Sequence, residues 1–146
     1  MSTAPDLVVR SSNESILLAV EVRNLPNTSA EWAARMRRDL AARGFLPDAP
    51  FFLLALRDHF YLWKRPPPLE LVPPDYQAET REVLRPYLGS IRTPLHELSE
   101  PGFESVVSLW LGDLVYNTPN GGSEWLRDSG LRECIRNGTI TSPAGV

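Results

Sequence analysis

The chain has 146 residues, of which 42% are hydrophobic and 23% are charged, and its net charge is −3. This length suits one domain with one core, and the ordinary apolar fraction excludes wholesale disorder. The acidic balance excludes a protein that coats nucleic acid through bulk positive charge, although it is compatible with a local basic patch. No apolar run approaches the about 18 residues of a membrane helix, and the single cysteine excludes an internal disulfide. We therefore expect a cytoplasmic protein with no membrane-embedded part.

Two short aliphatic segments near the N-terminus, residues 7–10 and 16–23, predict a β-hairpin with a polar turn between them. Side chains alternate along a strand, so Glu21 and Arg23 share one face of the second strand and Val22 lies on the other. If paired positions sum to 27, Asp6 lies opposite Glu21, with Cβ atoms about 5 Å apart. A slip of one residue would place the two carboxylates on opposite faces.

A helix is predicted after the hairpin. Thr28 and Glu31 have the spacing of a capping box, the helical pattern extends to about Ala42, and Gly44 suits a left-handed C-cap. Four positions are expected on the buried side of this helix: Trp32, Ala33, Met36 and Leu40. The opposite side carries three arginines, Arg35, Arg38 and Arg43, which form either a solvated face or a phosphate-contacting one.

The apolar run from Pro50 to Leu56 predicts a strand buried on both faces, and residues 60–64 predict a further strand after a turn that contains His59. The strand, helix, strand order from Glu21 to Leu56 implies a parallel pair joined by a crossover helix. We therefore expect an α/β protein with a small mixed sheet and one crossover helix.

The second half of the chain is predicted to be helical. A proline-rich connection over residues 66–74 follows a sheet core over residues 1–65, and a helical layer over residues 75–138 completes one domain. Within that layer we expect helices from Asp75 to about Leu84, from Phe103 to Tyr116, after a Ser123 cap, and from Leu131 to Ile135. The tail from Thr139 is expected to fray.

The hairpin carries the one constellation with recognisable chemistry, since two carboxylates meet at neighbouring strand ends. A hard divalent cation such as Mg²⁺ takes oxygen ligands and keeps several waters, so one or two acids and a backbone carbonyl suffice as protein ligands. In phosphodiester hydrolysis such an ion orients water and stabilises charge on phosphate oxygens. A nearby cation stabilises the same charge.

In these residues the chain resembles the PD-(D/E)XK superfamily, the restriction-endonuclease-like nucleases. The matching positions are Pro5-Asp6 at the start of one strand and Glu21-Val22-Arg23 at the end of the next, followed by a helix and a buried strand. The resemblance covers about the first 64 residues. It implies a metal-dependent nuclease acting on DNA, with Asp6, Glu21 and the Val22 carbonyl as ligands of Mg²⁺ or Mn²⁺.

The chain departs from that family at two points. Arg23 replaces the lysine of the motif, and a guanidinium can stabilise phosphate charge but cannot act as a base near neutral pH. The family core also begins with a helix and a strand that have no counterpart ahead of Asp6. The C-terminal helices replace that layer, a partner or second copy supplies it, or the chain is a shortened descendant.

Two further expectations concern partners. Arg10, Arg35 and Arg38 are candidates for contacts with a DNA backbone, and Arg23 is a candidate for charge stabilisation in catalysis. The strand that holds Phe60, Tyr61 and Trp63, or the Leu7 strand, is expected to form an exposed sheet edge that a homodimer would cover. The alternative to a nuclease is a catalytically silent member of the same fold that acts as a protein-interaction or assembly module.

Overall fold

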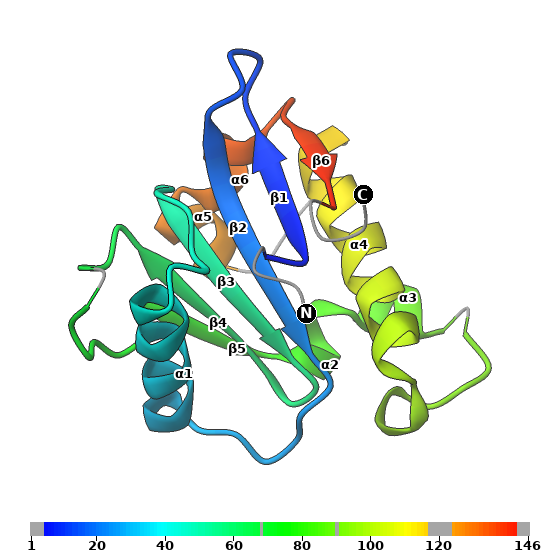
Figure 1. Ribbon diagram of the computed structural model, residues 1–146. Helices are drawn as coiled ribbons and strands as arrows, with labels where there is room; N and C mark the ends of the chain where they lie inside the picture. Colours follow the sequence, from blue (N-terminus) through cyan, green and yellow to red (C-terminus); the bar gives the residue numbers. More distant parts are fainter. Residues whose placement is uncertain (1–4, 68, 90, 117–123, 143–146) are drawn as a thin grey trace.

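The computed structural model describes residues 5–67, 69–89, 91–116 and 124–142 of the chain. Its strands are β1 (Leu7–Arg10), β2 (Ile16–Arg23), β3 (Phe51–Leu56), β4 (His59–Lys64), β5 (Tyr76–Glu79) and β6 (Thr139–Thr141). Its helices are α1 (Ala30–Ala42), α2 (Thr80–Val83), α3 (Arg85–Leu88), the 3₁₀ turn η1 (Leu95–Glu97), α4 (Glu100–Tyr116), α5 (Glu124–Ser129) and α6 (Leu131–Ile135). The strands form one mixed sheet in the order β5-β4-β3-β2-β1-β6 (Figure 1). The expected α/β class is confirmed.

The N-terminal hairpin has the register on which the predicted site depends. Leu7 pairs with Val20 and Val9 pairs with Leu18, so the paired numbers sum to 27 as expected. Beyond Val9 the register shifts, because Arg10 pairs with Ile16 and leaves Leu17 as the extra residue of a β-bulge. The bulge lies at the turn end of the hairpin. At the open end the undisturbed register brings Asp6 opposite Glu21.

The crossover that follows the hairpin is also confirmed. β2 and β3 are parallel, from Leu18 beside Phe51 to Arg23 beside Leu56, and α1 connects them. All six residues of β3 are buried, as expected for a strand covered on both faces. Because β2 has a paired strand on each side, the backbone at Glu21 and Arg23 is held within the sheet.

The two ends of α1 differ in how well the sequence predicts them. Gly44 has a φ of +75° and the Phe45 amide donates to the Leu40 carbonyl (2.9 Å), which forms the expected left-handed C-terminal cap. The predicted capping box is wrong, because Ser29 is the N-cap and accepts a hydrogen bond from the Trp32 amide. The Thr28 hydroxyl instead donates to the Asp58 carboxylate (2.7 Å).

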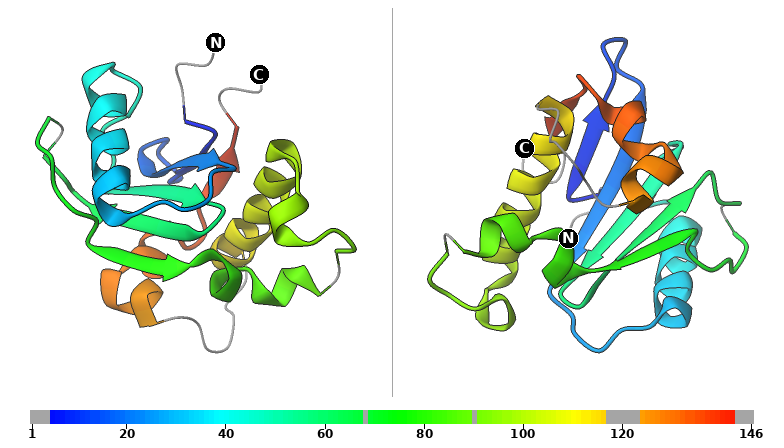
Figure 2. Two further views of the ribbon diagram at one scale, coloured as in Figure 1. Left: turned by 90° about the horizontal axis from the view of Figure 1, so that it is seen from below. Right: turned by 180° about the vertical axis from the view of Figure 1, so that it is seen from behind.

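Two apolar cores lie on the two faces of the sheet (Figure 2). One core contains α5, α6 and the buried apolar stripe of α4, which includes Phe103, Val106, Val107, Trp110, Leu111 and Leu114. The other core lies under α1, where Ala33 and Leu40 are buried as expected. The prediction fails for Trp32, whose side chain is 36% exposed.

The buried side of α1 also contains a charged residue, Arg37, which is 1% exposed. Its guanidinium donates to the carbonyls of Pro67 and Glu70 (3.1 and 2.6 Å) and lies 6.0 Å from the centre of the Trp63 ring. These hydrogen bonds hold the proline-rich connection against α1.

Strands occupy two segments that were expected to be helical or frayed. Residues 76–79 form β5, paired with β4, and only residues 80–83 begin the expected helix as α2. Residues 139–141 form β6, paired with β1. Consequently neither the Phe60 strand nor the Leu7 strand is a sheet edge, and the expectation of an exposed edge there is wrong. The predicted Ser123 cap lies outside the described residues.

Within the described parts of the chain, no helix has the length and apolar character needed to cross a membrane.

Candidate functional site

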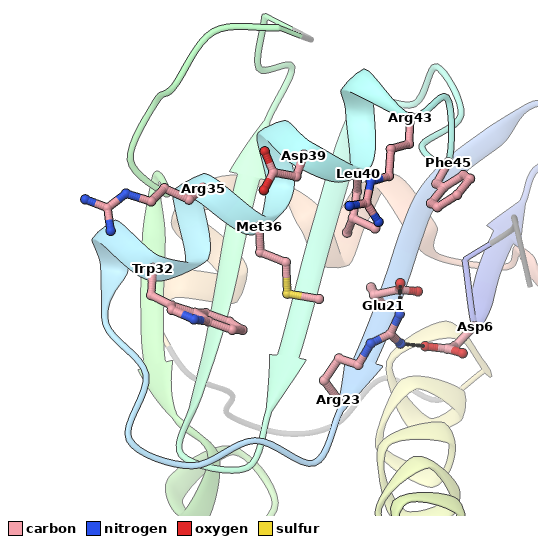
Figure 3. A pocket seen from close by; sticks show the side chains of 10 residues that line it. All are labelled: Asp6, Glu21, Arg23, Trp32, Arg35, Met36, Asp39, Leu40, Arg43 and Phe45. Atoms are coloured by element: carbon pink, nitrogen blue, oxygen red, sulfur yellow. Dashed lines mark hydrogen bonds and ion pairs between the residues drawn. The ribbon is translucent and has the colours of Figure 1, made fainter.

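The two acids of the hairpin occupy adjacent strand ends on the face of the sheet that α1 covers (Figure 3). Asp6 lies directly before β1, and its Oδ2 accepts a hydrogen bond of 2.7 Å from the Val22 amide. Glu21 lies near the end of β2 and is only 5% exposed. This bond joins the Val22 backbone to the Asp6 side chain just beyond the last paired residues of the hairpin, so it fixes the position of the Asp6 carboxylate.

Arg23 bridges the two acids. Its Nη2 lies 2.7 Å from Glu21 Oε2, and its Nη1 lies 3.2 Å from Asp6 Oδ2. The same Nη1 donates to the Val22 carbonyl at 3.0 Å. All three groups predicted to hold a metal therefore contact the Arg23 guanidinium, Glu21 through Nη2 and the other two through Nη1.

Burial changes the protonation of Glu21. Removal from water raises the pKa of its carboxyl to about 7, against the opposing effect of the Arg23 charge, and the neighbouring Asp6 carboxylate adds to the rise. The ion pair with Arg23 is short, yet it does not compensate for the lost hydration of a nearly buried carboxylate. Near neutral pH this carboxyl is therefore close to the midpoint of its titration.

The donor set fits a hard divalent cation. Two carboxylates and one carbonyl are enough protein ligands for Mg²⁺ or Mn²⁺, which complete their shells with water. No group of three or more His, Cys, Asp or Glu side chains suited to a metal occurs among the residues that the structure describes, so this smaller set is the one to consider. Its occupation requires Arg23 to move outward, and the Arg23 side chain is 35% exposed and faces the pocket.

A pocket of about 560 Å³ opens beside these acids, between the sheet and α1. Besides Asp6, Glu21 and Arg23, its lining comprises one acid, two arginines and four apolar side chains: Asp39, Arg35, Arg43, Trp32, Met36, Leu40 and Phe45 (Figure 3). The acids and Arg23 come from the sheet side, and most of the other groups come from one face of α1.

The three arginines proposed to contact a nucleic-acid backbone are not brought together. Arg35 lines the pocket, and Arg43, from the same face of α1, joins it. Arg38 lies 3.8 Å from Asp39 and does not line the pocket. Arg10 is at the turn end of the hairpin, where it donates to the Glu14 carbonyl (3.2 Å). Arg35 and Arg43 therefore line the same pocket as the acids, although the Arg35 guanidinium points away from them in Figure 3.

Glu104 of α4 is a third acid near the site that the sequence did not indicate. Its pKa is raised, first by burial and then by the negative charges of Asp6 and Glu100. The sequence places Glu104 beside the apolar stripe of α4 but has no signal for where the start of that helix lies relative to β1. Trp32 was missed as a pocket residue because its helical spacing matched the buried face.

His59 contacts an acid that has a structural role. It is the first residue of β4, and its Nδ1 lies 3.2 Å from Asp58 Oδ2. Burial opposes ionisation of Asp58, but hydrogen bonds from Thr28, together with His59, lower the pKa of its carboxyl overall. Asp58 therefore serves to hold the chain at the entry to α1.

No protein-family model, curated protein or solved structure matches this chain.

Proposed function

We propose that the chain is a metal-dependent nuclease-like domain of the PD-(D/E)XK kind, in which Asp6, Glu21 and the Val22 carbonyl hold Mg²⁺ or Mn²⁺ for phosphodiester hydrolysis of DNA. One observation carries this proposal: three oxygen donors from two strand ends converge on a single cation, the Arg23 guanidinium, at the edge of a pocket. The atoms that contact the guanidinium are carboxylate and carbonyl oxygens, which are also the ligands that a hard metal ion prefers.

The arrangement around the acids supports the same proposal. The hairpin, the crossover helix α1 and the buried strand β3 follow one another in the order that the resemblance requires. The helices α4 to α6 cover the second face of the sheet, so both faces of the nuclease-like core are covered by helices. Arg35 and Arg43 supply positive charge at the pocket, which a phosphate backbone needs.

Asp6, Glu21 and Arg23 have separate roles in this mechanism. Asp6 and Glu21 hold the ion as carboxylates, which requires Glu21 to lose its proton. Arg23, once released from the acids, stabilises negative charge on the phosphate without exchanging a proton. The bound ion would supply a water of lowered pKa and charge neutralisation at the phosphate. Residues on α1 position the substrate strand along the pocket.

A cleavage assay tests the proposal. Single-stranded, double-stranded and branched DNA are incubated with Mn²⁺ and the wild type, Glu21→Ala or Asp6→Ala, with the exposed Glu97→Ala as a matched control outside the pocket. The proposal predicts cleavage by the wild type and the control and loss of cleavage in both acid variants. Cleavage that survives Glu21→Ala would contradict it. A gain in rate for Arg23→Lys would identify the natural chain as a weakened enzyme.

A second function, a catalytically silent interaction or assembly module, is favoured by the same Arg23 contacts. The guanidinium donates hydrogen bonds to both acids, so these carboxylates have a cationic partner without a metal ion. If this is the function, neither the wild type nor Arg23→Lys cleaves any DNA, and both acid variants are merely less stable.

A further inference from the structure

Trp32 is the most exposed tryptophan of the chain, because Trp125 is half-buried and the other two are buried. Trp63 and Trp110 are 0% and 4% exposed, whereas Trp32 is 36% exposed and lines the pocket. It lies in the first turn of α1, where its amide donates to the Ser29 hydroxyl (3.1 Å), so a rigid helix end holds it. Figure 3 shows its indole beneath α1 on the same side as Met36 and directed toward the strand that carries Arg23.

The chemistry of the pocket wall on α1 is that of an aromatic platform with cations beside it. Trp32, Met36 and Phe45 supply apolar surface, and Arg35 and Arg43 supply charge. Within the described segments neither arginine forms an ion pair, so both guanidinium groups are available to an anion. The volume of about 560 Å³ suits one small ligand unit and not a double helix.

We propose that this pocket binds a single-stranded nucleic acid by stacking one unpaired base on Trp32, with the neighbouring phosphate at Arg43 or Arg35. This inference rests on the proposed function, because it names the substrate class of the same pocket. A base presents its flat face to an aromatic side chain only when it has left the duplex stack. The net charge of −3 also disfavours binding of duplex by bulk electrostatics, so base stacking has to supply much of the affinity.

The test measures binding without cleavage. A metal chelator is present so that no cleavage occurs. We record the fluorescence anisotropy of three labelled ligands of one sequence as wild-type protein is added: single-stranded DNA, single-stranded RNA and duplex DNA. Either single strand is expected to bind more tightly than the duplex, and the two single-stranded arms separate DNA from RNA. Trp32→Ala is expected to weaken binding by about tenfold, the effect of losing one stacked base, and Trp32→Phe to restore part of it.

Two further variants separate stacking from charge. Leu109→Ala removes an exposed apolar side chain of α4 outside the pocket and is expected to bind like the wild type. Arg43→Ala is expected to reduce the slope of log affinity against log salt by about 0.7, and Trp32→Ala to leave that slope unchanged. The inference is overturned if the duplex binds as tightly as the single strands, or if Trp32→Ala binds like the wild type.

The outcomes for binding and for cleavage are independent. Trp32-dependent binding of single strands without any metal-dependent cleavage supports the inference and overturns hydrolysis. Metal-dependent cleavage, together with binding that is unchanged in Trp32→Ala, supports hydrolysis and overturns the inference.

Discussion

At the scale of single residues, the buried carboxyl of Glu21 links folding to pH. Its pKa is raised from 4.5 to about 7, mainly by burial, so between these values the native state holds a proton that the unfolded chain has lost. The free energy of unfolding contributed by this group therefore falls as pH rises from about 4.5 to about 7.

Replacement of this carboxyl gives a stability prediction. Glu21→Gln cannot titrate, so we expect its free energy of unfolding to decline less steeply across that pH window than that of the wild type. Urea denaturation at a series of pH values measures both slopes. The exposed Glu97→Gln provides the matched control and should retain the wild-type slope. Parallel slopes for the wild type and Glu21→Gln would contradict the raised pKa.

Arg23 is the residue that competes with a metal ion. Its hydrogen bonds to Asp6 and Glu21 must break when an ion binds, and a hydrogen bond between charged groups is worth about 1.5–3 kcal/mol. Arg23→Met keeps the apolar stem and removes the cation, so we expect Mn²⁺ to bind about ten- to a hundredfold more tightly. Calorimetry above the pKa of Glu21 measures the change. Equal or weaker binding by Arg23→Met would show that the guanidinium does not block the site.

Residue chemistry alone predicted part of this site. The pairing of Asp6 with Glu21 was predicted on the condition that paired positions sum to 27, and the hairpin has that register. The bridging position of Arg23 did not follow, because the rotamer of a long side chain depends on its three-dimensional neighbours. Glu104 and Trp32 were missed for the same reason, since helix packing decides which side chains reach the pocket.

At the scale of elements, the ends and interiors of helices give opposite expectations for glycine. Gly44 has a φ of +75°, so Gly44→Ala should lower the free energy of unfolding by about 1 kcal/mol. Gly112 lies inside α4, and an added Cβ there would meet nothing within 4 Å, so Gly112→Ala should raise it by about 0.5–1 kcal/mol. Urea denaturation of both variants measures these changes. Effects of the same sign would contradict the described backbone at one of the two positions.

The elements with strong periodicity were predicted well and the short edge strands were not. The α4 stripe and the apolar β3 carry their own signals, because burial on a face or on both faces fixes the pattern of residues. β5 and β6 have four and three residues, and their pairing with β4 and β1 provides most of their order. Such strands depend on a neighbour that local sequence does not identify.

At the scale of the whole molecule, β5 and β6 change the expectation about assembly. The edges of the sheet are these two short strands, which offer few free backbone groups for pairing with another chain. The sheet therefore no longer supplies the reason for a homodimer. A candidate surface for a partner is instead the pocket between α1 and the Asp6–Glu21 pair, where charged and aromatic side chains lie together.

The metal site is the central claim, and calorimetric titration with Mn²⁺ tests it most directly. Wild-type protein, Glu21→Ala and the control Arg10→Ala are titrated above the pKa of Glu21, about 7, so that its carboxyl is ionised. We predict one ion bound per chain by the wild type and by Arg10→Ala, and no binding at this site by Glu21→Ala. Absence of binding to the wild type, or equal binding by the wild type and Glu21→Ala, would contradict the account.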